Sequence, residues 1–265
     1  MLGAIAGDII GSVHEFSRNE DPNFVLFPPT AAPTDDSILT CALASACLSP
    51  SPDYRAELIN AFNLAQERPH AGKIQPGWGS GFADWAANPG PKRNKSYGNG
   101  AAMRVSPIAW AYSKMEEVLR EARRSALPSH AHPEGIRGAQ ATALAIWTAR
   151  LTRDPKAVRQ AVEKFYNPLP TLDHIRKTHH YNETCQGCVP DALVIACEAP
   201  DFETAIRWAC SIRGDADTLA AIAGGVAEAL HGLPIPIALE AEARLTRCYP
   251  WAATSLKAAR QRWCT

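Results

Sequence analysis

Residues 135–151 read GIRGAQATALAIWTARL, and this stretch decides the fold class. The segment is rich in alanine, and its apolar residues predict a helix that lies in the interior of the protein. Separate segments before and after it also have apolar residues at the spacing of one helix face. They are Met115, Val118, Leu119 and Ala122 on the N-terminal side and Val158, Ala161, Val162 and Phe165 on the C-terminal side. Further helices are expected at residues 36–48, 190–198, 203–212, 217–231 and 236–247. The only strand-like run of the sequence, residues 24–27, is short, so we expect an all-α protein.

These helices are expected to form one domain that spans residues 1–265. The chain is 46% hydrophobic and 20% charged, which is ordinary for a folded globular protein. Short connections between helices suit a packed bundle, and the many alanines and glycines permit close helix–helix contact. Residues 69–100, rich in Gly, Pro, Asn and Lys, are predicted to lack regular structure. A loop of that length in a compact domain usually has a function.

The charge balance argues against large anionic partners. Lys plus Arg and Asp plus Glu both number 27, whereas a protein that binds long nucleic acid or an anionic membrane usually carries a basic excess. The apolar N-terminus lacks a basic region and is interrupted by Asp8. No apolar run approaches the roughly 20 residues of a membrane span. We therefore expect a cytoplasmic monomer with no membrane partner.

The cysteines predict no zinc or redox site. Cys185 and Cys188 form a single CxxC, with no second pair and no histidine at zinc-finger spacing. Free cysteines on apolar helices behave as small hydrophobic residues. Buried thiols are the expected outcome.

Two short acidic motifs stand at the starts of two predicted helices. Residues 34–37, TDDS, precede the helix at 36–48, and residues 214–218, GDADT, precede the helix at 217–231. A helix cap explains one aspartate at each start but not two together with a threonine. Paired carboxylates at the start of a buried helix are costly unless a cation neutralises them. If the two starts converge, their oxygen ligands would select a hard cation such as Mg²⁺ or Mn²⁺.

Residues 95–104, KSYGNGAAMR, predict a loop that enters a helix. Gly98, Asn99 and Gly100 tolerate positive φ, and such a loop can direct backbone N–H groups at a diphosphate. Arg104, one turn inside the helix, could add a charge-assisted contact. An Asn-Gly turn before a helix is also common without any ligand.

A histidine pair, His130 and His132, precedes the helix at 135–151. Such a pair could bind a metal, but without carboxylates at a suitable spacing it more often caps or packs against a helix. Both interpretations stay open from the residues alone.

In this order, the segments resemble the ADP-ribosylglycohydrolase family, which includes the dinitrogenase reductase-activating glycohydrolase and eukaryotic ADP-ribosyl-hydrolases. The matching segments are residues 7–12 (GDIIGS) with Glu15, then residues 34–37, 96–104, 129–130 and 214–218. They run through most of the chain, and the length resembles the compact bacterial branch.

The resemblance implies an all-α hydrolase that binds ADP-ribose at a binuclear Mg²⁺ or Mn²⁺ centre. When the family's metal-ligand positions are carried over one by one, the implied ligands are Thr34, Asp35, Asp36, Asp215, Asp217 and Thr218. The implied catalytic carboxylates are Glu15 and Asp36. The implied substrate-binding residues are Ser96, Tyr97, Gly98, Asn99, Gly100, Arg104 and His130.

The implied reaction removes ADP-ribose from a modified target by cleaving the bond at ribose C1″. A protein is the leading target, with arginine the family's traditional acceptor. Serine, a modified nucleic-acid base and O-acetyl-ADP-ribose are alternatives. A non-catalytic ADP-ribose-binding module would not need the complete ligand set, and a two-metal phosphoesterase would give no role to residues 96–104 or Glu15.

Two positions depart from the family pattern. Ser37 stands where threonine is frequent, and it keeps the hydroxyl. Arg213 stands where a glycine commonly precedes the second acidic motif, and we expect its side chain to alter the rim of the pocket or the choice of substrate.

Overall fold

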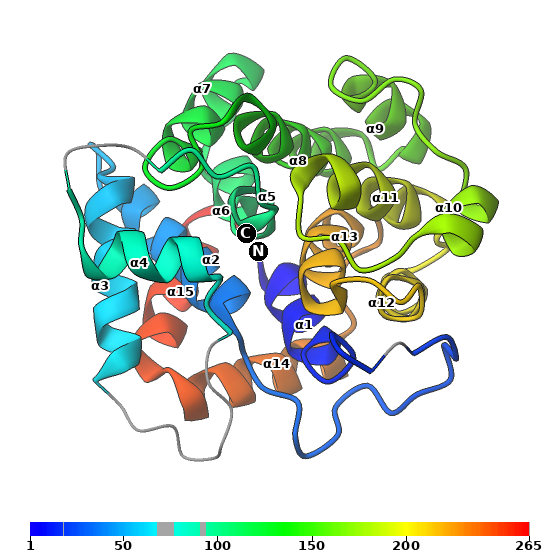
Figure 1. Cartoon of the computed structure of the whole chain (residues 1–265), viewed down its shortest axis with the longest axis horizontal. Coiled ribbons are helices and arrows are strands. Elements are labelled where there is room, and N and C mark those ends of the chain that lie inside the picture. The colour runs from blue at the N-terminus through cyan, green and yellow to red at the C-terminus, as the bar shows by residue number, and fades with distance from the viewer. Residues whose placement is uncertain (18, 68–76, 91–93, 265) are drawn as a thin grey trace.

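The computed structural model describes residues 1–17, 19–67, 77–90 and 94–264, and it is built of helices (Figure 1). The first eight are α1 (Leu2–Gly11), α2 (Asp35–Leu48), α3 (Tyr54–Gln66), α4 (Ser80–Ala87), α5 (Gly100–Met103), α6 (Ser106–Ala111), α7 (Met115–Ala126) and α8 (Pro133–Thr152). They are followed by α9 (Pro155–Val162), α10 (Leu172–Thr178), α11 (Cys185–Glu198), α12 (Phe202–Cys210), α13 (Ala216–His231), α14 (Ile235–Cys248) and α15 (Pro250–Trp263). Within these ranges the only β-type pairings are two isolated bridges, Lys95 with His130 and Gly98 with Thr184. The all-α prediction is confirmed.

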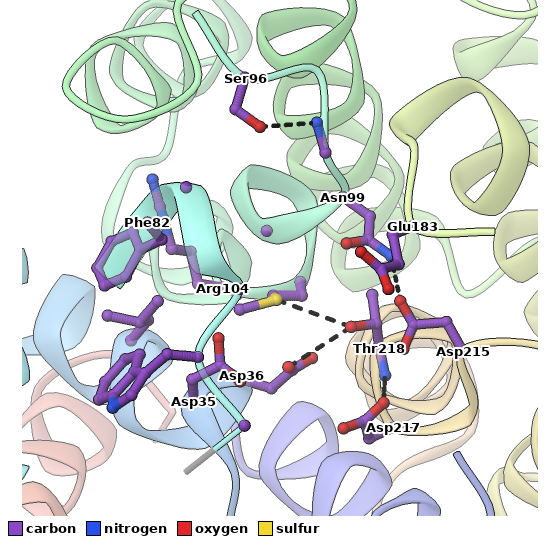
Figure 2. A pocket seen from close by; sticks show the side chains of 18 of the residues that line it. Asp35, Asp36, Phe82, Ser96, Asn99, Arg104, Glu183, Asp215, Asp217 and Thr218 are labelled. Carbon is purple, nitrogen blue, oxygen red and sulfur yellow. Dashed lines mark hydrogen bonds between the residues drawn. The ribbon is translucent and has the colours of Figure 1, made fainter. Parts of the chain in front are cut away.

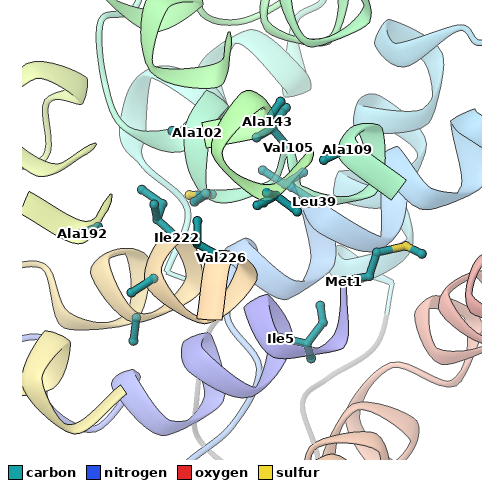
Figure 3. Close-up of a cluster of buried hydrophobic side chains, with 14 of the residues drawn as sticks. Met1, Ile5, Leu39, Ala102, Val105, Ala109, Ala143, Ala192, Ile222 and Val226 are labelled. Carbon is teal, nitrogen blue, oxygen red and sulfur yellow. The ribbon is translucent and has the colours of Figure 1, made fainter. Parts of the chain in front are cut away.

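Helices α1 and α13 form the centre of the molecule. Every residue of α1 is buried, and α13 packs along α1 while it also contacts α8, α11 and α12. The approach is close because Gly3, Gly7 and Gly11 recur on one face of α1, and a Cβ at Gly7 would lie 2.0 Å from the carbonyl oxygen of Ala220. Figure 3 shows apolar side chains of both helices in the cluster that joins them to α2, α5 and α8.

Most of the expected helices are present, and side-chain caps account for many of their starts. Residues 135–151 lie in α8, whose first turn is capped by the imidazole of His132. Other caps accept a backbone N–H in the same way, namely Thr34, Asp53, Asp154, Thr171, Thr184 and Asp201. Residues 24–27 form no strand.

The prediction that residues 69–100 lack regular structure is wrong in part. Ser80–Ala87 form α4, because Phe82, Trp85 and Ala86 have the spacing of one helix face and are buried together. Residues 68–76 and 91–93 of that stretch lie outside the described residues. In the part of the chain that is described, no helix combines the length and apolarity that a bilayer crossing would need.

Candidate active site

A cavity of about 670 Å³ opens where the starts of α2, α4, α5 and α13 face one another (Figure 2). Its volume lies in the usual range for sites that bind a small ligand. Thirteen of the residues expected at the site line it: Glu15, Asp35, Asp36, Ser96, Tyr97, Gly98, Asn99, Gly100, Arg104, His130, Asp215, Asp217 and Thr218. Thr34 is not among the lining residues, because its hydroxyl points to Asp8. The structure thus brings the two acidic motifs together.

The first acidic motif stands at the start of α2. Thr34 is the N-cap and accepts the N–H of Asp36 at 3.3 Å, which fixes the direction of the two carboxylates that follow. Asp35 and Asp36 are both buried, at 9% and 2% exposure. A cap is therefore present here, as expected for an acidic helix start, but the threonine supplies it and neither aspartate acts as the cap.

The second acidic motif reaches the same place from α13. Asp215 is the N-cap residue of α13 without a side-chain cap bond, and Asp217 lies in the first turn. The hydroxyl of Thr218 lies 3.5 Å from Oδ2 of Asp36, so the two helix starts are within direct contact. Close packing of α1 on α13 and α2 holds this geometry.

Asp8 belongs to this cluster and was not predicted. It lies on α1, is fully buried, and accepts the hydroxyl of Thr34 at 2.6 Å and the backbone N–H groups of Thr34 and Ser37 at 3.0 Å. The Ser37 hydroxyl also donates to it. A carboxylate inside an otherwise apolar helix is the signal in the sequence, since an ionised group is rarely buried without partners.

Carboxylate oxygens converge in two groups, Asp8 with Asp36 and Asp217, and Glu15 with Asp215 and Asp217. In each group the three oxygens lie within 4.8 Å of one another. Among the described residues no Lys or Arg forms an ion pair with them, and Oδ1 of Asp36 is buried without a hydrogen-bond partner. All-oxygen ligands with an unmet acceptor suit a hard divalent cation.

Burial and mutual repulsion shift the acidity of this cluster. Burial raises the pKa of Asp35, Asp36 and Asp217 well above its ordinary value, and neighbouring carboxylates add to the effect. Burial also raises the pKa of Asp8 and that of Asp215 to about 6, with hydrogen bonds opposing the shift in both. The pKa of Glu15 rises to about 8, first through burial and then through Asp217. The cluster therefore favours bound protons or bound cations over free charge.

The loop at residues 96–100 borders the acidic cluster. The Oγ of Ser96 accepts the N–H of Gly98 at 3.0 Å, and the side-chain amide of Asn99 donates to Asp215 at 2.7 Å. Gly98, Asn99 and Gly100 tolerate positive φ, but none of the three adopts it. Glycine is required at position 100 for a different reason, because a Cβ there would lie 2.9 Å from Nε2 of His130.

The side chain of Arg104 is buried more deeply than a residue that only binds a phosphate group at the cavity surface would be. It is fully buried and donates to Oγ of Ser129 at 2.8 Å and to the carbonyl of Ser125 at 3.3 Å. Its guanidinium also lies 5.9 Å from the ring centroid of Phe82, and its Nε and Nη1 have no partner. Burial lowers the pKa of Arg104 to about 10, which still leaves it charged at neutral pH. It is a fixed cation on the side of the cavity away from α13.

The two histidines separate in the structure. His130 is buried, lines the cavity, and its Nδ1 lies 2.9 Å from Oγ of Ser129. Burial lowers the pKa of His130 well below its ordinary value, so it is neutral. His132 caps α8 and is not among the lining residues. The capping alternative is thus correct for His132 only.

Arg213 does not line the cavity. It adopts a positive φ of 61°, and its guanidinium lies 3.1 Å from the carboxylate of Glu20 on the surface. The glycine that the pattern favours at this position would adopt that φ without strain.

Several lining residues were missed in the sequence. They are Phe16, Leu39, Gly77, Trp78, Gly79, Ser80, Gly81, Phe82, Met103, Tyr181, Glu183 and Thr184. The glycines around Trp78 indicate a backbone that comes close to a ligand, which is a usable signal. Tyr181 and Glu183 belong to the connection between α10 and α11, which carries no motif.

Cys185 and Cys188 are buried thiols, as expected. Sγ of Cys185 donates to the carbonyl of Gly98 at 3.1 Å, so α11 braces the loop at residues 96–100 from behind. Burial raises the pKa of both thiols, which keeps them protonated.

Known proteins resemble this chain in sequence and in fold. The sequence profile of the ADP-ribosylglycohydrolase family matches residues 1–261. "ADP-ribosylhydrolase ARH3" of Xenopus tropicalis is 24% identical, across 91% of this chain and 89% of its own length. The protein of that name from Homo sapiens is 27% identical, across 88% of this chain and 84% of its own. A solved structure of an "ADP-ribosylglycohydrolase-related protein complex" superposes with a TM-score of 0.64 at 22% identity, covering 95% of this chain and 97% of the other, and has the same fold.

Proposed function

Because this chain belongs to the ADP-ribosylglycohydrolase family and is therefore a hydrolase of glycosidic bonds, we propose that it removes ADP-ribose from modified protein side chains with the help of divalent cations. The observation that carries the proposal is the meeting of Asp36 on α2 with Asp217 on α13 in the floor of one cavity. That cavity is large enough for a nucleotide sugar, and the loop at residues 96–100 forms its wall.

The proposed cations are two Mg²⁺ or Mn²⁺ ions. The two carboxylate groups of the cluster share Asp217, which supports neighbouring ions with a common ligand. The proposed ligands are Thr34, Asp35, Asp36, Asp215, Asp217 and Thr218, and we add Asp8 to them as a direct or supporting oxygen. The unmet oxygen of Asp36 supports this assignment.

The diphosphate is proposed to bind at residues 96–100. The side chains of Ser96, Tyr97 and Asn99 line the cavity there, at the start of α5. Arg104 and His130 lie behind them, so Arg104 supplies positive charge to the anionic part of the ligand through a short, buried path. Phe82 and Trp78 offer an aromatic face across the cavity.

Cleavage at ribose C1″ passes through an oxocarbenium-like state, so the leaving group needs a proton and the attacking water must lose one. Bound divalent cations would orient the ribose hydroxyls and lower the pKa of water. Glu15 is the proposed proton donor, since burial and the neighbouring Asp217 raise its pKa to about 8 in the protein without cations. Asp36 is the proposed acceptor of the proton that the water loses.

The test is to incubate the protein with Mg²⁺ and ADP-ribose linked to arginine, to serine and to DNA, and to measure released ADP-ribose. Release from a protein side chain is expected, and tight ADP-ribose binding without release from any substrate would overturn the proposal. The cation site is tested separately with Asp35→Ala and Asp217→Ala. Unchanged metal occupancy in both variants would show that the proposed metal centre is wrong.

A further inference from the structure

Gly214, the first residue of the second acidic motif, lies against an imidazole ring. A Cβ built on Gly214 would be 2.5 Å from Nε2 of His179 and 2.9 Å from Cδ2 of the same ring. The same Cβ would be 2.4 Å from Cδ1 of Leu219. The His179 ring and the Leu219 side chain therefore occupy the space that a larger residue at position 214 would need.

A carboxylate on α11 orients that ring. His179 is the C-cap residue of α10, and its Nδ1 donates a hydrogen bond to Oδ2 of Asp191 at 2.6 Å. The side chain of His179 is only 2% exposed, so neighbouring atoms enclose the ring on almost every side. Because one nitrogen is bound to a carboxylate and the ring is enclosed, the imidazole has little freedom to turn.

The second nitrogen of the ring meets Gly214 without a hydrogen bond. Nε2 of His179 is buried and has no partner among the described residues. Its contact with Gly214 is therefore van der Waals packing of a fixed ring against the backbone. A fixed ring in this place limits the path that the chain can take just before Asp215.

Asp215 depends on contacts of this kind because its own helix supplies few. It is the N-cap residue of α13 and makes no side-chain cap bond. In the described part of the chain, the N–H of Gly214 donates to no other backbone group. The side-chain amide of Asn99 donates to the Asp215 carboxylate at 2.7 Å (Figure 2). Asn99 thus fixes the side chain of Asp215, whereas His179 fixes the backbone one residue before it.

His179 and Asp191 do not line the cavity that contains the acidic cluster. They line a separate hollow of about 460 Å³. Any effect of this pair on a ligand in the cavity must therefore pass through the backbone of Gly214 and Asp215.

We propose that His179, oriented by Asp191, is a positioning residue that places Asp215 for cation binding. This inference rests on the proposed function and adds to its cation centre a residue pair outside the cavity. Mg²⁺ demands near-ideal octahedral geometry, so a small shift of the backbone at Asp215 weakens its binding.

His179→Asn tests the assignment, because asparagine keeps a donor for Asp191 near the place of Nδ1 and removes Nε2 from Gly214. Calorimetric titration of the full chain with Mg²⁺ alone should give an affinity about tenfold lower than that of the wild type. Urea unfolding in EDTA, measured beside it, shows that the titrated protein is folded. Asp191→Ala leaves the ring in place but free to turn, and it should weaken Mg²⁺ binding by a smaller factor.

A double-mutant cycle with Gly214→Ala tests the contact itself. In the wild-type background Gly214→Ala should weaken Mg²⁺ binding, because the new Cβ must displace the ring or the backbone. In the His179→Asn background Nε2 is gone, so the same substitution should cost less affinity. The combined loss should be at least about threefold smaller than the product of the two single losses.

His174→Asn is the matched control, since His174 is exposed on the same helix and does not line the cavity. It should bind Mg²⁺ as the wild type does. A His179→Asn protein that is less stable in EDTA but binds Mg²⁺ with full affinity would show that the pair only ties α10 to α11. Losses in the cycle that simply multiply would show that the ring does not act through Gly214. Either result overturns this inference and leaves the proposed function standing, whereas a wild type that binds no Mg²⁺ overturns the cation centre and this inference together.

Discussion

Protons and cations compete for the carboxylates of the cavity, and Asp8 and Asp215 show the competition most directly. Each has a pKa near 6 in the folded protein, against an ordinary value of 3.8. Between these values the folded state binds more protons than the unfolded state. The unfolding free energy of the metal-free protein should therefore lose a contribution from these groups as pH rises from 3.8 to about 6.

Metal affinity should have the opposite pH dependence, because a cation must displace the bound protons. The association constant for Mg²⁺ or Mn²⁺ is expected to rise about tenfold per pH unit for each proton displaced, up to the folded pKa. Calorimetric titration at pH 5 and 7, in two buffers of different ionisation enthalpy, would measure both affinity and proton release. Equal affinity at both pH values would contradict the electrostatic account of this cluster.

Arg213 is strained by its backbone conformation, with φ at 61°. A non-glycine residue there costs about 1–2 kcal/mol, whereas the extra freedom of glycine in the unfolded chain costs about 0.5–1 kcal/mol. Arg213→Gly should therefore raise the unfolding free energy by roughly 0.5 kcal/mol. The substitution also removes the exposed ion pair with Glu20, so the comparison must exclude that loss. Urea unfolding in a Glu20→Gln background makes that correction. A lower stability than the background would show that the αL conformation carries no penalty here.

The contact between α1 and α13 is the element-scale feature on which the site depends, since α1 carries Asp8 and α13 carries Asp217. A Cβ at Gly7 would enter the backbone of Ala220, and backbone atoms cannot rotate away as a side chain can. Gly7→Ala should therefore lower the unfolding free energy by about 1–3 kcal/mol and weaken metal binding by moving the two aspartates apart.

Gly90→Ala is the control for that substitution, because nothing lies within 4 Å of a Cβ built at Gly90. It should leave the unfolding free energy and metal affinity close to those of the wild type. Equal effects of the two substitutions, followed by urea unfolding and metal titration, would argue that the close contact does not hold the site.

Helices whose apolar residues recur with a clear period could be predicted from sequence, and those without one could not. The spacing of Met115, Val118, Leu119 and Ala122 predicts α7 on this basis. Helix α1 is buried on every side, so it has no polar face to reveal its period. Helix α4 lies in a run of glycines whose turn character hides the spacing of Phe82 and Trp85.

The candidate site divides in the same way. Two carboxylates at each of two helix starts exceed what capping explains, so Asp36 and Asp217 could be predicted from local sequence. Tyr181 and Glu183 could not, because they reach the cavity only through the bridge between Gly98 and Thr184, which is tertiary. Residues that reach a site only through contacts between distant loops leave no pattern in the local sequence.

At the scale of the whole molecule, the carboxylate cluster joins parts of the chain that are far apart in sequence. Asp8, Asp36 and Asp217 come from α1, α2 and α13, and each is held by packing rather than by the cluster itself. Without a cation their repulsion opposes that packing. A bound cation would turn the repulsion among the carboxylates into attraction to the ion, so ion binding and global stability are coupled.

The coupling predicts a metal-dependent melting temperature. At a free Mg²⁺ or Mn²⁺ concentration one hundred times Kd, stability should increase by about 2.7 kcal/mol over the protein in EDTA. Asp36→Asn removes one buried charge, so in EDTA it should melt at or above the wild type, while added metal should raise its Tm little. Asp53→Asn, at the exposed cap of α3, is the matched control and should keep the full metal response. Thermal melts of the three proteins with and without metal decide the matter, and an Asp36→Asn protein with an undiminished response to metal would place the cation elsewhere.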